Sequence, residues 1–405
     1  MKRTYLLAFL ILFFLTGYAQ NRVVLAPESR SKSKQVTSSI KESKYQQSKE
    51  ISTDVSKEVE YDAIGNTFFD LQSNYSMQNR IFKYPDNTIA GVWSMGFNNP
   101  SFIDRGTGYN YFDGSGWDPY PLERIEPDRC GWPSYAPWGT NGEIVVAHYS
   151  GAAQEGLVIS SRTTKGTGPW IFANLPGPTS SNFYLWPRAM TGGSNYNSLH
   201  IIALTAPVAN GGAIYQGMNG ALLYSRSNDG GNSWEVEDLL LDEINADNYV
   251  GFNGDTYEIQ TQGDNVAFLV GSSWTDLVLM KSTDNGDTWE KTIIWEHPYP
   301  MYDPEMPFET DTFYCVDGSH TLAFDNTGKV HVAFGINRTY DNGTGSIYWF
   351  PGVGGIGYWN EDRIPFSNNV NALNPYGEPG SEMIEDYNLI GWSQDIDGNG
   401  ELEPS

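Results

Sequence analysis

Two matched eight-residue segments constrain the fold of this chain more than any other feature. They are Ser227-Asn-Asp-Gly-Gly-Asn-Ser-Trp234 and Ser282-Thr-Asp-Asn-Gly-Asp-Thr-Trp289. Each follows a strand-like run, over residues 221–224 and 277–280. The Asp side chain can accept hydrogen bonds from backbone N–H groups of its own turn, and the second Gly supplies a positive φ at little steric cost. The Trp then returns on the next strand as a large apolar plug. The pattern therefore predicts two tight β-hairpins in an all-β chain.

This repeat resembles the Asp-box (BNR) repeat of sialidase-like β-propellers. The matching positions are Ser227, Asp229, Gly231, Trp234, Ser282, Asp284, Gly286 and Trp289. In proteins with this repeat it marks the outer hairpin of a propeller blade, while ligands bind at the mouth of the central channel. The resemblance therefore implies an architecture and structural roles for these eight residues, and it leaves the activity open.

A longer repeat of blade size runs through the chain. Its first half is a strand, a turn with Gly or Asn, and a very apolar strand, and it occurs at residues 80–93, 132–148, 186–204, 257–270 and 321–334. A second strand pair with a polar turn and a Trp follows each copy. We therefore expect a β-propeller of about five four-stranded antiparallel blades. Residues 389–402 resemble the opening of a sixth blade in a truncated chain, the alternative being a tail that lies on blade five.

The beginning of the chain predicts export. Lys2, Arg3 and the apolar run 5–15, followed by Gly17 and Ala19, predict a cleaved signal peptide over residues 1–19. An uncleaved signal anchor is the alternative. Residues 20–60 are polar and predict a flexible leader, so the propeller domain covers residues 61–405. No later segment is apolar enough to span a membrane. Segments 104–111, 203–212 and 272–276 also resemble exported bacterial propeller proteins, which implies a secreted or cell-surface location.

The charge balance narrows the choice of partner. The chain carries 24 Lys and Arg against 49 Asp and Glu, a formal net charge of −25. So acidic a surface repels phosphate backbones, so we expect no nucleic-acid partner. Its 13 Trp and 25 Tyr residues supply faces for sugar stacking or protein contact. We therefore predict a propeller that binds extracellular carbohydrate or protein without catalysing a reaction.

The alternative is a sialidase-like exo-glycosidase acting at the channel mouth. Such enzymes hold an anionic sugar with three arginines and use a Tyr–Glu pair and an acidic residue. The residues of this chain that the resemblance offers for those roles are Arg80, Asp104, Arg129, Arg188, Tyr257 and Glu258. However, the Arg-Ile-Pro motif of these enzymes is broken here, because Phe82 follows Arg80 and Ile81. Residues 363–365 do read Arg-Ile-Pro, but they lie far too late in the chain to be on the opening blade. The broken motif favours the binding function.

Two further sets of residues leave alternatives open. Asp395, Asp397 and Asn399, followed by Gly400 and with the Glu401 carbonyl, match the first part of a calcium loop, or else form an ordinary hairpin turn. Calcium is the only cofactor that we consider, and the function requires none. Separately, Cys130 and Cys315 form either one disulfide, which an exported protein permits, or two free thiols.

Overall fold

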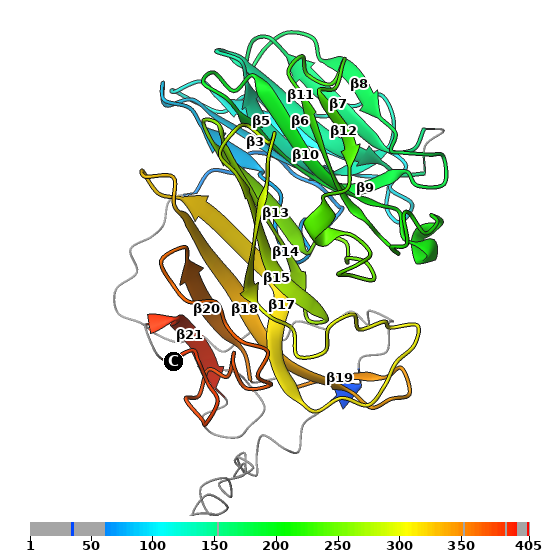
Figure 1. Cartoon of the computed structure of the whole chain (residues 1–405). Helices are drawn as coiled ribbons and strands as arrows, with labels where there is room; N and C mark the ends of the chain where they lie inside the picture. The colour runs from blue at the N-terminus through cyan, green and yellow to red at the C-terminus, as the bar shows by residue number, and fades with distance from the viewer. Residues whose placement is uncertain are drawn as a thin grey trace, which may run out of the picture.

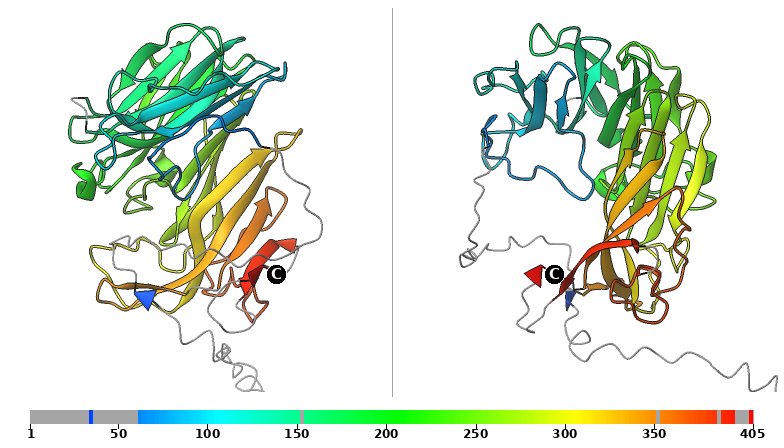
Figure 2. Two further views of the ribbon diagram at one scale, coloured as in Figure 1. Left: turned by 180° about the vertical axis from the view of Figure 1, so that it is seen from behind. Right: turned by 90° about the vertical axis from the view of Figure 1, so that its left-hand side faces the viewer.

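A computed structural model describes residues 61–151, 154–350, 353–384 and 387–394, together with two short strands at 34–35 and 403–404. The predicted signal peptide, most of the leader and the calcium loop lie outside the described residues. Within them the chain is all-β, with two short 3-10 helices, Val208–Asn210 and Asp242–Ile244. The strands form five antiparallel sheets that follow one another around an arc in chain order (Figures 1 and 2).

The first three sheets correspond to the first three predicted blades. The first contains β2 (Ile81–Lys83), β3 (Ile89–Met95) and β4 (Gly106–Phe112). The second contains β5 (Cys130–Trp138), β6 (Gly142–Tyr149), β7 (Leu157–Arg162) and β8 (Ile171–Leu175). The third contains β9 (Tyr184–Gly192), β10 (Ser198–Thr205), β11 (Leu222–Ser227) and β12 (Val236–Leu239).

The last two sheets complete the arc. The fourth contains β13 (Tyr257–Gln262), β14 (Asn265–Ser272), β15 (Thr275–Ser282) and β16 (Glu290–Trp295). The fifth contains β17 (Phe313–Phe324), β18 (Val330–Asp341), β19 (Ile347–Trp349), β20 (Gly355–Asn360) and β21 (Leu389–Gln394). Short strands β1 (Lys34–Gln35) and β22 (Glu403–Pro404) pair with β19 and β21.

The fold is the predicted β-propeller, with one correction at its end. Residues 389–402 are expected from the sequence to open a sixth blade, but their first strand, Leu389–Gln394, pairs with β20 and so belongs to the fifth sheet. The opening sheet has three strands instead of four, although Trp117 still bridges to Phe112 beside it. The innermost strands β5, β9, β13 and β17 contact one another in sequence, so one side-chain row of each lies close to the axis.

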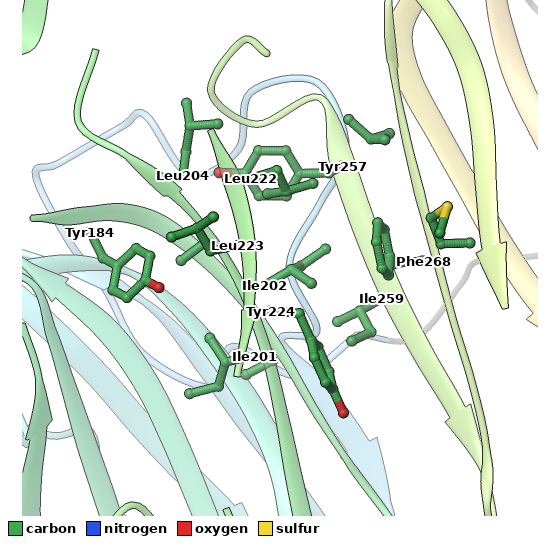
Figure 3. Close-up of a cluster of buried hydrophobic side chains, with 14 of the residues drawn as sticks. Tyr184, Ile201, Ile202, Leu204, Leu222, Leu223, Tyr224, Tyr257, Ile259 and Phe268 are labelled. Atoms are coloured by element: carbon green, nitrogen blue, oxygen red, sulfur yellow. The ribbon is translucent and has the colours of Figure 1, made fainter. Parts of the chain in front are cut away.

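The core lies between neighbouring sheets. Between the third and fourth, Ile202 and Tyr224 meet Tyr257, Ile259 and Phe268 (Figure 3). Every residue of β10 is buried, which explains why the middle strands read as continuous apolar runs instead of alternating ones. Because each sheet buries its faces on its neighbours, a single blade has too little apolar contact to be stable alone.

The two turns that resemble Asp boxes, called Asp-box turns below, join consecutive blades. Asp284 Oδ1 accepts a bond from Thr288 N (2.9 Å), and Asp229 Oδ1 accepts one from Ser233 N (2.8 Å). These are the within-turn bonds expected of the two carboxylates. The turn of the fourth blade also reaches back to the third, where Arg226 forms an ion pair with Asp287 (2.7 Å). Both turns therefore lie at the blade periphery and hold blades together.

Candidate functional site at the channel mouth

The inner strands begin with backbone irregularities that aim side chains at one end of the channel. Trp132 in β5 (φ 56°) and Trp186 in β9 (φ 48°) lie at register shifts, and both precede a proline. Asp255, just before β13, has φ 69°, and β17 has its own shift near Gly318. Bulky residues rarely adopt positive φ, and such strain and bulges are concentrated at functional sites. Two neighbouring inner strands thus carry the same Trp-Pro distortion, and the other two have irregular backbone within or just before the strand.

A buried ion pair organises this end of the channel. Arg188 Nη2 lies 3.0 Å from Asp255 Oδ1, and both side chains are almost completely buried. The other Asp255 oxygen accepts bonds from Trp132 Nε1 (3.2 Å) and Asn74 Nδ2 (3.4 Å). Burial raises the pKa of Asp255, and the Arg188 charge opposes that rise. The pair therefore links the second, third and fourth blades and fixes the edge of the Trp132 ring.

The segment 74–80, which precedes β2, passes through the middle of this arrangement. Ser76 Oγ donates to His320 O (2.9 Å) of β17, and the Ser76 carbonyl accepts a bond from Arg188 (2.6 Å). Further along, Asn79 O accepts from Tyr135 N (2.7 Å), and Asn79 Oδ1 accepts from Gln260 Nε2 (3.2 Å). This axial segment therefore contacts the inner strands of all four following blades.

The solvent-facing part of the mouth combines aromatic rings with carboxylates. Tyr75 (φ 51°) is 51% exposed, and the rings of Trp132 and Trp186 are half-buried. Burial raises the pKa of Tyr75, and the charges of Asp317 and Asp255 raise it further, so the phenol lies near both carboxylates. Asp317 accepts a bond from Ser319 N (2.7 Å) and has no ion-pair partner among the described residues. Such a surface offers apolar ring faces beside acceptors for hydroxyl groups.

The structure places the three predicted arginines at two different positions. Arg80 lies near Arg188: burial lowers the pKa of Arg80 to about 10, with the Arg188 charge as the next cause. Arg129 instead donates to Phe102 O (2.8 Å) and to the Ser150 carbonyl and hydroxyl. Asp104 accepts bonds from the N–H groups of residues 97 and 98; burial acts to raise its pKa, but these bonds bring the net value below normal.

Tyr257 and Glu258 do not form a nucleophile–base pair. Because neighbouring strand residues point to opposite faces, Tyr257 packs toward the third blade and Glu258 toward the fifth. The Tyr257 hydroxyl donates to Trp186 O (2.7 Å), and burial raises its pKa well above the normal range. Glu258 accepts bonds from Gln260, Thr321 and Leu322 N, and burial raises its pKa to about 7.

The other predicted site residues lie elsewhere or outside the described chain. Cys130 and Cys315 are free, buried thiols that belong to different hydrophobic clusters, so the disulfide alternative is not realised. Asp395, Asp397, Asn399 and Glu401 lie outside the described residues, and the calcium loop stays a prediction. In the described ranges, no three His, Cys, Asp or Glu residues are grouped as a metal site. No helix there is long and apolar enough to cross a membrane.

Sequence reasoning missed the residues that make up most of this mouth, namely Tyr75, Trp132, Asp255 and Asp317. One signal was present in the sequence. Trp-Pro occurs at 132–133 and again at 186–187, at the same place in two consecutive repeats. The repeated Trp-Pro pair at the start of two inner strands was therefore a signal that could have pointed to this end of the channel.

Comparison with known proteins finds no protein-family model and no curated protein that matches the sequence. Solved structures with a similar fold include a sialidase of Trypanosoma rangeli (11% identity, 67% of this chain and 47% of that one, TM-score 0.38). An endo-arabinase from Bacteroides thetaiotaomicron is 12% identical over 71% of this chain and 96% of that one (TM-score 0.38). A six-bladed lectin of Aleuria aurantia is 12% identical over 64% and 72% (TM-score 0.32). The assignment of the fold rests on the strand pairing of this chain itself.

Proposed function

We propose that this protein is a secreted or cell-surface propeller that binds a carbohydrate at the channel mouth without cleaving it. The observation that carries the proposal is the set of aromatic rings, Tyr75, Trp132 and Trp186, that strained backbone holds at one end of the channel. A sugar ring stacks its C–H face on such rings, while its hydroxyls donate to nearby carboxylates such as Asp317. Rigid aromatic faces lose little conformational entropy on binding.

The positions of the predicted catalytic residues support binding over hydrolysis. A tyrosine nucleophile needs a free hydroxyl beside a base, but the Tyr257 hydroxyl is bonded to a carbonyl and Glu258 faces another blade. The carboxylate of Asp255 is engaged by three donors, which suits a structural hub better than proton transfer. A protein ligand is the other partner that we considered, and the absence of binding to every glycan in the experiment below would favour it.

The test is isothermal titration of the full chain with neutral and acidic oligosaccharides, with Trp132→Ala and Trp186→Ala as variants. We expect the wild type to bind at least one glycan and each variant to lose affinity about tenfold, equivalent to the 1–2 kcal/mol of a stacked ring. Trp392→Ala is the matched control, because Trp392 is 38% exposed on β21, far along the chain from the mouth. Equal binding by all three variants would contradict the proposal.

One observation keeps a hydrolase as the second candidate. Glu258, with a pKa raised to about 7, is a carboxyl that can carry a proton at neutral pH, as a general acid must. Release of reducing sugar by the wild type, abolished in Glu258→Gln with glycan binding retained, would identify an acid–base glycosidase. A fluorogenic sialoside tests the sialidase alternative, and Arg80→Ala is its control.

A further inference from the structure

Arg105, which immediately precedes β4, lies beside the aromatic mouth in an unusual environment. Its side chain is 7% exposed, and its guanidinium lies 5.0 Å from the Phe69 ring centroid and 5.7 Å from that of Trp132. Nε donates to Cys130 O (2.9 Å). The two terminal nitrogens have no protein acceptor among the described residues, yet they are not sealed from solvent. Arg105 is thus anchored through Nε, and both of its terminal nitrogens are left to donate to a ligand.

Arg129, which precedes β5, brings a second charge to the same place. Its Nε and Nη1 are fixed by Phe102 O and Ser150, which leaves Nη2 without a protein acceptor in the described part of the chain. Burial lowers the pKa of Arg105 to about 10, and the nearby Arg129 charge is the next cause. The two guanidinium groups therefore lie close enough to repel each other.

No carboxylate in the described part of the chain forms an ion pair with either arginine. This holds although Asp104 and Asp128 are their neighbours in sequence and the chain has twice as many acidic as basic side chains. The Asp104 carboxylate is engaged by the N–H groups of residues 97 and 98. His148, stacked on Trp132 (5.6 Å), stays neutral, because burial and the surrounding arginines lower its pKa to about 3. Arg105 is buried and Arg129 is half-buried, and two such adjacent charges without a counter-ion are costly unless an external anion neutralises them.

We propose that Arg105 and Arg129 bind an oxyanion, the carboxylate or sulfate ester of an acidic glycan whose sugar ring rests on Trp132. This inference rests on the proposed function and specifies its ligand class. Guanidinium groups match both oxyanions because their planar N–H donors form charge-assisted hydrogen bonds with two oxygens. The anion also neutralises the repulsion between the two arginines, so binding relieves a cost already present in the free protein. The apolar C–H face of the sugar stacks on the aromatic rings, as in the proposed function.

The experiment titrates three polymers into the full chain: polygalacturonate, dextran sulfate and neutral dextran. The salt concentration is about 0.15 M, so that charges are screened as under physiological conditions. The wild type is expected to bind at least one acidic polymer about tenfold or more tightly than dextran, as two charge-assisted hydrogen bonds allow. Arg129→Gln and Arg105→Lys should each remove most of that preference. Polygalacturonate and dextran sulfate separate a carboxylate from a sulfate ligand.

Arg124→Gln is the matched control, because it removes the same charge nearby while each of the three Arg124 nitrogens is already bonded to a carbonyl oxygen. It should keep the preference for the acidic polymer. Dextran binding and an unchanged melting temperature show that each variant is folded. Binding of dextran without any acidic preference would overturn this inference and leave the proposed function standing. Failure of every glycan to bind would overturn both.

Discussion

At the scale of single residues, the mouth depends on charged groups that are buried and satisfied by specific partners. The Arg188–Asp255 pair holds the Trp132 ring from beneath and connects three blades. A buried pair contributes little net stability compared with an apolar replacement, but removal of one partner leaves the other charge uncompensated. Its main effect here is to specify the geometry of the mouth.

Asp255→Asn is therefore expected to lower the free energy of unfolding by about 3 to 5 kcal/mol, because the Arg188 guanidinium stays buried without its counter-charge. Urea unfolding followed by tryptophan fluorescence measures this. Asp247→Asn, at an exposed position after the third blade, is the control and should change the value by less than about 0.5 kcal/mol. Similar losses of unfolding free energy in both variants would show that the ion pair is no more important for stability than an exposed carboxylate.

Glu258 gives a prediction on pH. Because burial raises its pKa to about 7, the folded protein keeps a proton that the unfolded chain releases near 4.5. Its contribution to stability is thus most favourable below pH 4.5 and declines as the pH rises to 7, by up to about 3 kcal/mol. Glu258→Gln cannot lose the proton, so the wild type should lose stability relative to this variant between pH 5 and pH 8. A constant difference across that range would show that the carboxyl titrates normally.

At the scale of elements, the Asp-box turns act as connectors between blades. A Cβ on Gly286 (φ 86°) would lie 2.0 Å from the hydroxyl of Tyr224 in β11, and that hydroxyl is itself bonded to His200. The glycine thus serves both the turn conformation and the contact with the preceding blade. The pattern in the sequence reveals the first role, whereas the second depends on packing across the interface.

Gly286→Ala should accordingly cost more stability than Gly263→Ala. Gly263 also has a positive φ (59°), but a Cβ there would meet nothing within 4 Å. We expect Gly263→Ala to lower the free energy of unfolding by about 1 kcal/mol, because of backbone strain alone. Gly286→Ala should lower it by about 1 to 3 kcal/mol more, because the new methyl group overpacks the contact with Tyr224. Differential scanning calorimetry of the two variants provides the comparison. Equal melting temperatures would mean that Tyr224 moves aside freely.

The sequence predicts elements far better than the site. Strand runs and turn residues are local and the blade period repeats along the chain, so the five sheets and the hairpin turns at Asp229 and Asp284 could be predicted from the sequence. The mouth is built from long-range pairs, such as Arg188 with Asp255, Trp132 with Asp255, and Tyr75 beside Asp317. No local pattern encodes those pairs. The Tyr257–Glu258 pairing failed for a simple reason, since adjacent strand positions face opposite ways.

At the scale of the whole molecule, the excess of acidic side chains works against compactness. A net charge of −25 repels itself, and this repulsion weakens as the Debye length falls from about 30 Å at 0.01 M salt to about 8 Å at 0.15 M. We expect the melting temperature to rise by a few degrees over that range, with a chelator present. Sodium chloride and choline chloride should act equally, because screening depends on ionic strength. A rise with only one of the two cations would indicate specific ion binding instead.

The axial segment also bears on how the chain reaches this structure. Ser76 and His320 are bonded although 244 positions separate them in the chain. Closing so long a loop carries a large entropic cost, and contacts of this separation form slowly. The contacts of residues 74–80 with β5, β9 and β13 involve strands that come earlier in the chain, whereas the contact with His320 requires β17. The axial segment therefore has its full set of partners only when the fifth sheet is in place. Final closure of the fold is therefore an event between the two ends of the domain, and the mouth becomes complete only with it.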